Sequence, residues 1–276
     1  MTSRVHRILI LCKTYPSPST KYSETSCVAG MDESGKLVRL YPVPFRLIED
    51  DKQFKKWQWI SVRLAKAGND HRPESHKIFV DTIQCDAEPL PTTNHWQERR
   101  IWLDKLPVFE SFETLEEARQ KHGITLALLR PKRVIALELK PVGTAEWTEE
   151  EKDKLLKMQL QGDLFSSETE KKSIAQLCKL PYDFYYRYEC DTHNGAVEHK
   201  HKIVDWEIGA LYWNTHRKHG QGWEKPFRAK LEEELPSRDL MFLMGTIHRF
   251  PDQWLIVSLI YPPRQRPEPE LQVSLF

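Results

Sequence analysis

The stretch SETSCVAGMDESGKLVRLYPVPF, at residues 23–45, decides how the N-terminal part of the chain folds. Two segments rich in strand-forming residues lie on either side of the sequence DESG, at residues 32–35, which is typical of a tight turn. This arrangement predicts a β-hairpin. The sequence on both sides of the hairpin supplies further strands.

Three more segments have the length and composition of strands. Residues 4–15 contain an apolar run, and residues 76–87 are another strand candidate. Residues 57–67 alternate between two faces, with Ile60 on one face and Trp59 on the other. Short strands separated by proline and glycine predict a small barrel or a curled sheet.

Two helical patterns follow the strands. Residues 93–106 predict a helix that begins at Thr93 or Asn94, because threonine and asparagine are preferred at helix N-caps. Residues 114–123 predict a second helix, which ends at Gly123.

One or two strands within residues 124–142 complete a β-rich, barrel-like domain that we expect over residues 1–143. The highly charged residues 144–178 predict a helix followed by a polar linker. Residues 179–263 show the order strand, strand, helix, helix, strand, strand and predict a smaller ββααββ domain. The proline-rich residues 264–276 predict a disordered tail, so the chain as a whole is expected to be α+β.

The bulk composition limits the classes of partner. Lysine and arginine number 41 against 40 acidic residues, and the net charge of +1 argues against a general polyanion binder. No apolar run reaches the roughly 18 residues of a membrane helix, so we expect no membrane partner. The 5 cysteines occupy scattered positions, which predicts free thiols in a reducing, cytoplasmic compartment.

The peptide QVSLF at residues 272–276 places two large apolar side chains in a segment that cannot bury them by itself. It resembles the short peptide by which bacterial DNA polymerases and repair proteins bind the β sliding clamp. The resemblance implies that Gln272 enters a polar subsite and that Leu275 and Phe276 fill an apolar pocket. Val273 is shorter than the usual leucine, which puts the affinity in doubt.

The sequence QGDLF at residues 161–165 repeats the pattern, and two such peptides would act bivalently on a ring with several pockets. The alternative is that the terminal Leu-Phe pair packs on its own domain and that the inner Leu-Phe pair ends a helix. The clamp hypothesis assigns a binding role to Gln161, Asp163, Leu164, Phe165, Gln272, Val273, Ser274, Leu275 and Phe276.

Cations interleaved with aromatic residues indicate a nucleic-acid surface, because lysine and arginine contact phosphates and tyrosine rings stack on bases. The alternative is a proline-stiffened loop that packs its tyrosines on the barrel. Both DNA and RNA remain open as ligands. The candidate residues are Lys13, Tyr15, Lys21, Tyr22, Arg39, Tyr41, Arg46, Arg130, Lys132 and Arg133.

Two clusters in the C-terminal part contain residue types that bind metals. Cys190 and His193 lie on one side of a predicted turn and His199 and His201 on the other, which makes a candidate Zn²⁺ site. The alternative is a polar hairpin with surface histidines.

The second cluster contains Asp205 and Glu207, which would share a strand face and hold Mg²⁺ as the catalytic residues of a phosphodiesterase. A common nuclease pattern has a lysine two residues after the glutamate, where this chain has Gly209. The alternative is that Asp205 caps the following helix and Glu207 stabilises its first turn.

The segments KTYPSPSTKYSETSCVAG, VRLYPVPF, DWEIG and MGTIHRF, followed by WLIVSLIYPP, resemble a bacterial protein family of uncharacterised activity. The Leu-Phe ending is part of the same resemblance. It implies a bacterial origin and nothing about activity.

Two functions remain open from the sequence. The first is an accessory protein of bacterial DNA metabolism, in replication, repair, mobile elements or anti-phage defence, that binds nucleic acid and docks on the clamp without a required cofactor. The second is a nuclease that depends on Mg²⁺ or Zn²⁺ and uses the Asp205 region. A third candidate is a sensor of small nucleotides or RNA built on the N-terminal barrel.

Overall fold

The predicted hairpin is present and starts the first sheet. Strand β3 (Ser23–Asp32) pairs antiparallel with β4 (Leu37–Val43). In the turn, the Asp32 Oδ1 atom accepts a hydrogen bond from the backbone N–H of Ser34 at 2.9 Å. Gly35 has a φ of +88°, a left-handed conformation that favours glycine.

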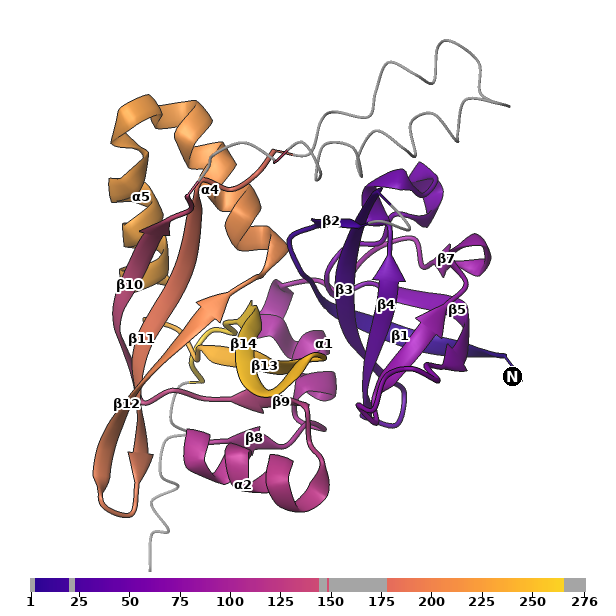
Figure 1. Cartoon of the computed structure of the whole chain (residues 1–276), viewed down its shortest axis with the longest axis horizontal. Helices are drawn as coiled ribbons and strands as arrows, with labels where there is room; N and C mark the ends of the chain where they lie inside the picture. The colour runs from indigo at the N-terminus through magenta and orange to yellow at the C-terminus, as the bar shows by residue number, and fades with distance from the viewer. Residues whose placement is uncertain (1–2, 20–22, 144–147, 149–177, 266–276) are drawn as a thin grey trace, which may run out of the picture.

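The computed structural model describes residues 3–19, 23–143, 148 and 178–265. Figure 1 shows two β-sheet units that lie side by side. In the N-terminal unit, five strands close into a barrel in the order β1-β3-β4-β6-β5, and β5 pairs again with β1. Besides the two hairpin strands, the barrel consists of β1 (Arg4–Lys13), β5 (Trp59–Lys66) and β6 (Ser75–Ile78).

The strand order is that of the OB-fold. Counted along the chain, the five barrel strands follow the ring order 1-2-3-5-4-1, and the third and fifth strands, β4 and β6, pair in parallel. This confirms the predicted α+β class with an N-terminal barrel for the described residues. Short elements connect the strands: β2 (Ser17–Ser19), η1 (Phe45–Leu47), η2 (Asp50–Lys52), η3 (Val80–Thr82) and β7 (Gln84–Cys85).

The second unit is a sheet with strand order β10-β11-β12-β14-β13-β9-β8. Most neighbours pair antiparallel, whereas β12 with β14 and β8 with β9 pair in parallel. Its strands are β8 (Val108–Phe109), β9 (Leu126–Leu129), β10 (Arg133–Pro141), β11 (Tyr182–Thr192), β12 (Gly195–Ile203), β13 (Met241–Ile247) and β14 (Phe250–Ile260).

The place where the chain changes sheets differs from the expected domain boundary at residue 143. Strand β9 pairs with β13, and β10 pairs with β11, so residues 108–141 belong to the second sheet. Their sequence predicts strands correctly but contains no local signal for the sheet that they join.

Helices cover the face of the second sheet that points away from the barrel (Figure 1). Tyr212, Phe227 and Leu231 from these helices pack in one core with Tyr186 and Phe242 of the sheet. The helical elements are α4 (Trp206–His219), η6 (Gly220–Trp223), α5 (Glu224–Arg228) and the π-helical turn η7 (Ala229–Glu234).

Helices α1 and α2, which lie before and after β8 in the chain, show one prediction that holds and one that does not. Helix α2 (Phe112–His122) ends at Gly123, whose φ is +68°, as expected for a left-handed C-cap. Helix α1 (Thr93–Leu103) was expected to begin at Thr93 or Asn94, but residues 94–96 have positive φ, so its regular turns begin later. In the described part of the chain, no helix is long and apolar enough to cross a membrane.

The central strands of the second sheet are buried on both faces. In β13, Phe242 and Met244 point toward the helices, whereas Met241 and Leu243 point toward the barrel. The barrel covers this second face with a different core, which includes Trp59 of β5. Burial on both sides accounts for the nearly continuous apolar sequence of β13 and β14.

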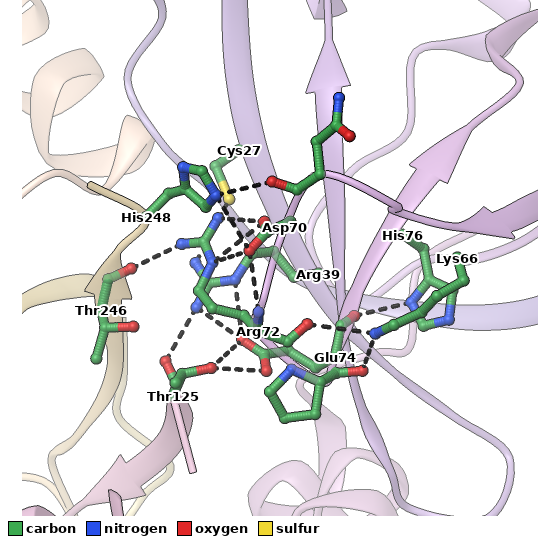
Figure 2. Close-up of polar contacts among 12 residues, drawn as sticks. Cys27, Arg39, Lys66, Asp70, Arg72, Glu74, His76, Thr125, Thr246 and His248 are labelled. Carbon is green, nitrogen blue, oxygen red and sulfur yellow. Dashed lines mark hydrogen bonds and ion pairs between the residues drawn. The ribbon is translucent and has the colours of Figure 1, made fainter. Parts of the chain in front are cut away.

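A buried polar junction crosses this boundary between the barrel and the second sheet (Figure 2). Arg39 of β4 is only 3% exposed and donates hydrogen bonds to Glu74 and to the carbonyl oxygen of Thr125, each at 3.0 Å. The Thr125 hydroxyl donates to the same carboxylate at 2.7 Å. A side chain at Gly245 would place its Cβ 3.2 Å from the guanidinium, so glycine leaves the space that Arg39 fills.

Replacing Arg39 by methionine is expected to lower the free energy of unfolding by about 3–5 kcal/mol, because the Glu74 carboxylate would stay buried without its cation. The double variant Arg39→Met/Glu74→Met should lose less than the single variant. Urea denaturation followed by circular dichroism measures both changes.

The matched control is Arg187→Met, which removes a partly exposed arginine that pairs with Glu198 at 2.7 Å. This change should cost at most about 1 kcal/mol. Equal losses in the Arg39 and Arg187 variants would show that the junction does not stabilise the fold.

Candidate nucleic-acid interface

A hollow of about 510 Å³ opens where the loop after β1 meets helix α4. Its wall combines aromatic side chains with two arginines and a histidine. Four of the five helix residues recur at intervals of four, three and four positions from Trp206 to Arg217, so they lie on one helix face, and His216 lies three positions after Trp213. The lining residues are Tyr15, Pro16, Arg46, Cys178, Trp206, Ala210, Trp213, His216 and Arg217.

Tyr15 is fixed against α4 by backbone and side-chain contacts. Its N–H donates to the carbonyl oxygen of Val204 at 2.8 Å, and its hydroxyl accepts a hydrogen bond from Trp213 Nε1 at 3.0 Å. The same hydroxyl donates to the carbonyl oxygen of Cys178 at 2.8 Å. A Cβ at Gly209 would lie 2.3 Å from the Tyr15 ring, so only glycine permits this approach.

Trp206 forms the floor between the barrel and the helix. Its ring lies 5.5 Å from that of Phe45 in an edge-to-face arrangement and 6.2 Å from that of Tyr15. The Lys13 ammonium lies 5.2 Å from the Trp206 ring and 3.6 Å from the Phe45 ring. Burial lowers the pKa of Lys13 to about 8, although Glu207 favours the charged form. The Lys13 ammonium is therefore held next to the aromatic rings of Phe45 and Trp206.

Asp205 and Glu207 are occupied by structural contacts. Asp205 is the N-cap of α4, because its Oδ1 accepts from the Glu207 N–H at 2.9 Å. Its Oδ2 accepts from the Ser258 hydroxyl at 2.9 Å and from the Leu259 N–H at 3.0 Å. The Glu207 carboxylate pairs with Lys56 at 2.9 Å. These contacts are those of the helix-capping alternative.

The pKa shifts of Asp205 and Lys56 agree with a structural role for the Asp205 and Glu207 carboxylates. Burial raises the pKa of Asp205, which is 3% exposed. Burial of the Lys56 ammonium favours its neutral form, but the charges of Asp205 and Glu207 raise its pKa. The buried Lys56 thus supplies the positive charge that a metal would bring to this carboxylate pair. Among the described residues, no histidine, cysteine or third carboxylate joins the pair as a metal-binding group.

The residues of the zinc hypothesis make separate contacts on β11, on β12 and in the turn between these strands. Cys190 is completely buried, and burial raises the pKa of its thiol to about 11, which disfavours the thiolate that zinc binds. His193 is exposed at the β11–β12 turn. His201 Nδ1 and the Tyr188 hydroxyl form a hydrogen bond of 2.9 Å, and the His199 ring packs near Phe112 with centroids 4.9 Å apart and an interplanar angle of 50°. In the part of the chain that the structure describes, these four residues do not meet as a metal-binding group.

The remaining basic candidates are dispersed. Arg39 is buried in the polar junction described above, and Tyr41 is 47% exposed on the barrel. Arg130, Lys132 and Arg133 lie around the start of β10, and each pairs with an acidic residue: Asp239, Asp191 and Glu189, respectively. Lys21, Tyr22 and both clamp-like peptides, at residues 161–165 and 272–276, lie outside the described residues.

Tyr15 and Arg46 are thus the sequence candidates that the structure places in the hollow. Four further residues of the hollow were missed: Trp206, Trp213, His216 and Arg217. The signal was present in the sequence, because Trp206, Trp213 and Arg217 are spaced as one face of a helix. The sequence did not show that the loop at Tyr15 faces them.

The partly buried His201 predicts a loss of stability in mild acid. Burial lowers the pKa of His201 to about 4, from an ordinary value near 6.5, so the unfolded chain binds the proton more readily than the folded chain. The free energy of unfolding should therefore fall as the pH drops from about 6.5 to about 4.

Urea denaturation across this pH range tests the effect. His201→Asn, whose side-chain amide can keep a hydrogen bond with Tyr188, should flatten the pH dependence, and His193→Asn at the exposed turn should leave it unchanged. A slope that is the same in all three proteins would assign the acid lability to other groups.

Comparison with known proteins gave two family matches. Residues 4–105 match the model described as Domain of unknown function (DUF8758), and residues 108–276 match Domain of unknown function (DUF8757). The border between the matches coincides with the change of sheets near residue 106. A comparison with curated proteins gave no match.

Among solved structures, one similar chain comes from "Structure and Conformational Change of a Replication Protein A Heterotrimer Bound to ssDNA". The identity is 10%, the TM-score is 0.25, and the match covers 94% of this chain. This chain spans 65% of that one. A TM-score this low does not establish a common fold, so the OB topology rests on the strand order. Its residues 4–105 match the DUF8758 model. The second family match covers more than half of the chain, so the chain belongs to the DUF8757 family.

Proposed function

We propose that the protein binds single-stranded nucleic acid in the hollow between the barrel and α4, as an accessory protein of bacterial DNA metabolism. The observation that carries this proposal is the lining: Tyr15, Trp206 and Trp213 beside Arg46 and Arg217. Aromatic rings stack on bases of any sequence, and arginines contact the phosphates between them. His216 and Arg217 line the hollow and are exposed, so a bound strand can reach them from solvent.

The OB topology supports this location in an indirect way. OB-folds bind oligonucleotides on the face of their second and third strands and with the loops after the first and fourth strands. Here the second sheet covers the outer face of β3 and β4, where Ala29 and Met31 pack in the shared core. The loop after β1 carries Tyr15, which lines the hollow, so this part of the usual OB surface stays accessible.

Removal of an aromatic ring should weaken binding of labelled oligo-dT. Trp213→Ala is expected to raise the Kd about 5- to 150-fold, which corresponds to the loss of one stacked base. Trp213→Phe keeps a ring and should lose less. Fluorescence anisotropy measures both, with single-stranded RNA as a second ligand to separate DNA from RNA preference.

Arg217→Ala should reduce the slope of log Kd against log salt concentration by about 0.7, the value for one phosphate contact on a single strand. The matched control is Lys121→Ala, an exposed cation on α2 at the other end of the molecule (Figure 1). If the slope for Arg217→Ala equals the slopes for Lys121→Ala and for the unchanged protein, the nucleic-acid strand does not bind in the hollow.

The nuclease alternative is tested in the same assay. Cleavage of the oligonucleotide in Mg²⁺ or Mn²⁺ that is lost in Glu207→Gln would support it, although the contacts of Asp205 and Lys56 favour a structural role. Glu207 is the better position for this test, because Asp205 holds the start of α4.

The clamp-like peptides supply the second part of the proposed function. The peptide at residues 272–276 offers leucine and phenylalanine, and burial of both in a pocket contributes about 3–6 kcal/mol before ordering costs. Such a contact is weak and reversible, as is typical of linear motifs. It would keep a nucleic-acid-binding protein near replicating DNA.

Surface plasmon resonance on a purified bacterial β clamp tests this tether. A chain that ends at Leu271 should bind at least tenfold more weakly than the full chain, and Leu164→Ala/Phe165→Ala should cause a smaller loss. The shortened chain should still bind oligo-dT, because the hollow is intact. Equal clamp binding by the full and shortened chains would overturn the tether.

A further inference from the structure

Two histidines and an aspartate, His71, His248 and Asp70, lie together where the barrel meets the second sheet, and Figure 2 shows two of them, Asp70 and His248, side by side. Asp70 and His71 lie in the loop between β5 and β6, and His248 lies in the turn between β13 and β14. One potential ligand atom from each residue lies within 4.8 Å of the other two. The three residues come from both structural units, so their proximity depends on how the units pack.

The neighbouring contacts hold this group in place. Arg72 donates to Asp70 Oδ1 at 2.9 Å and to Oδ2 at 2.7 Å, and it also donates to the carbonyl oxygen of Thr246 at 2.8 Å. The loop is thereby attached to the strand that leads to His248. His248 Nε2 lies 3.1 Å from the carbonyl oxygen of Asn69 and 3.8 Å from Asp70 Oδ1.

The imidazoles are already arranged side by side. The His71 and His248 rings are stacked, with centroids 5.3 Å apart and an interplanar angle of 27°. Both side chains are exposed, so each can change rotamer at little packing cost. In a tetrahedral zinc site, ligand atoms at about 2.0–2.1 Å from the metal lie roughly 3.4 Å from one another, so small rotations close the group.

We propose that Asp70, His71 and His248 bind a divalent transition-metal ion of the zinc class, with water as the fourth ligand. Two neutral imidazoles and one carboxylate are a donor set that zinc uses with an open position. The hydrogen bonds from Arg72 orient the carboxylate, as second-shell groups do in metal sites. A metal bound at His248 Nε2 would replace the contact of that nitrogen with Asn69.

A metal bound at this site would link the barrel to the second sheet. A metal that binds the folded chain and not the unfolded chain raises stability by mass action. This inference is independent of nucleic-acid binding, because the hollow contains none of the three ligands.

Isothermal titration of Zn²⁺ into the full-length protein, after dialysis against a chelator, tests the site. We expect one equivalent of tight binding, and His248→Ala should lose this equivalent or bind at least tenfold more weakly. His219→Ala, an exposed histidine at the end of α4, is the matched control and should bind as the unchanged protein does.

A second readout separates this site from zinc bound by thiols. Bound Co²⁺ should give the visible absorption of a four-coordinate nitrogen and oxygen site, without the thiolate charge-transfer band. The chelated protein should also have a lower Tm, which Zn²⁺ restores in the control and not in His248→Ala. Identical Zn²⁺ binding by the His248 and His219 variants would overturn the proposal.

Discussion

Burial of the second sheet on both faces is the constraint on which the rest of the structure depends. The side chains of β13 alternate between two cores, so Phe242 and Met244 need the helices and Met241 and Leu243 need the barrel. Neither cover can be removed without exposing a continuous apolar surface. The hydrophobic effect therefore fixes the barrel against the sheet, although the two units are separate in sequence.

The polar groups at this boundary determine which arrangement of the two units is formed. Apolar surfaces pack in several registers, but the buried Arg39 finds its partners in one of them. Glu74, the residue before β6, and the carbonyl oxygen of Thr125 before β9 accept hydrogen bonds from the guanidinium together, and Gly245 leaves room for it. Arg72 makes a second link, to Thr246. A displaced register would keep the Arg39–Glu74 pair, because both residues belong to the barrel, but it would remove the buried hydrogen bonds from the two arginines to Thr125 and Thr246.

The sequence predicted what local patterns determine. The turn at residues 32–35 and the alternation of β5 give correct strands, because both follow from neighbouring residues. The domain boundary was not predicted, because the apolar run at Leu126–Leu129 is compatible with either sheet and its partner β13 lies more than a hundred residues away. The Cys190 cluster illustrates the same limit: the local sequence does not show that Cys190 is completely buried or that the His199 and His201 rings pack against Tyr188.

The candidate sites could be predicted only as far as local sequence patterns define them. Trp213 and Arg217 have helical spacing in the sequence, but their role depends on the loop at Tyr15 from the other unit. His71 and His248 carry no motif at all, since they meet only when the β13–β14 turn reaches the barrel. Both sites are built from residues of the two units together. Any partner that binds at either site therefore stabilises the packed arrangement, and any change that separates the units removes both sites at once.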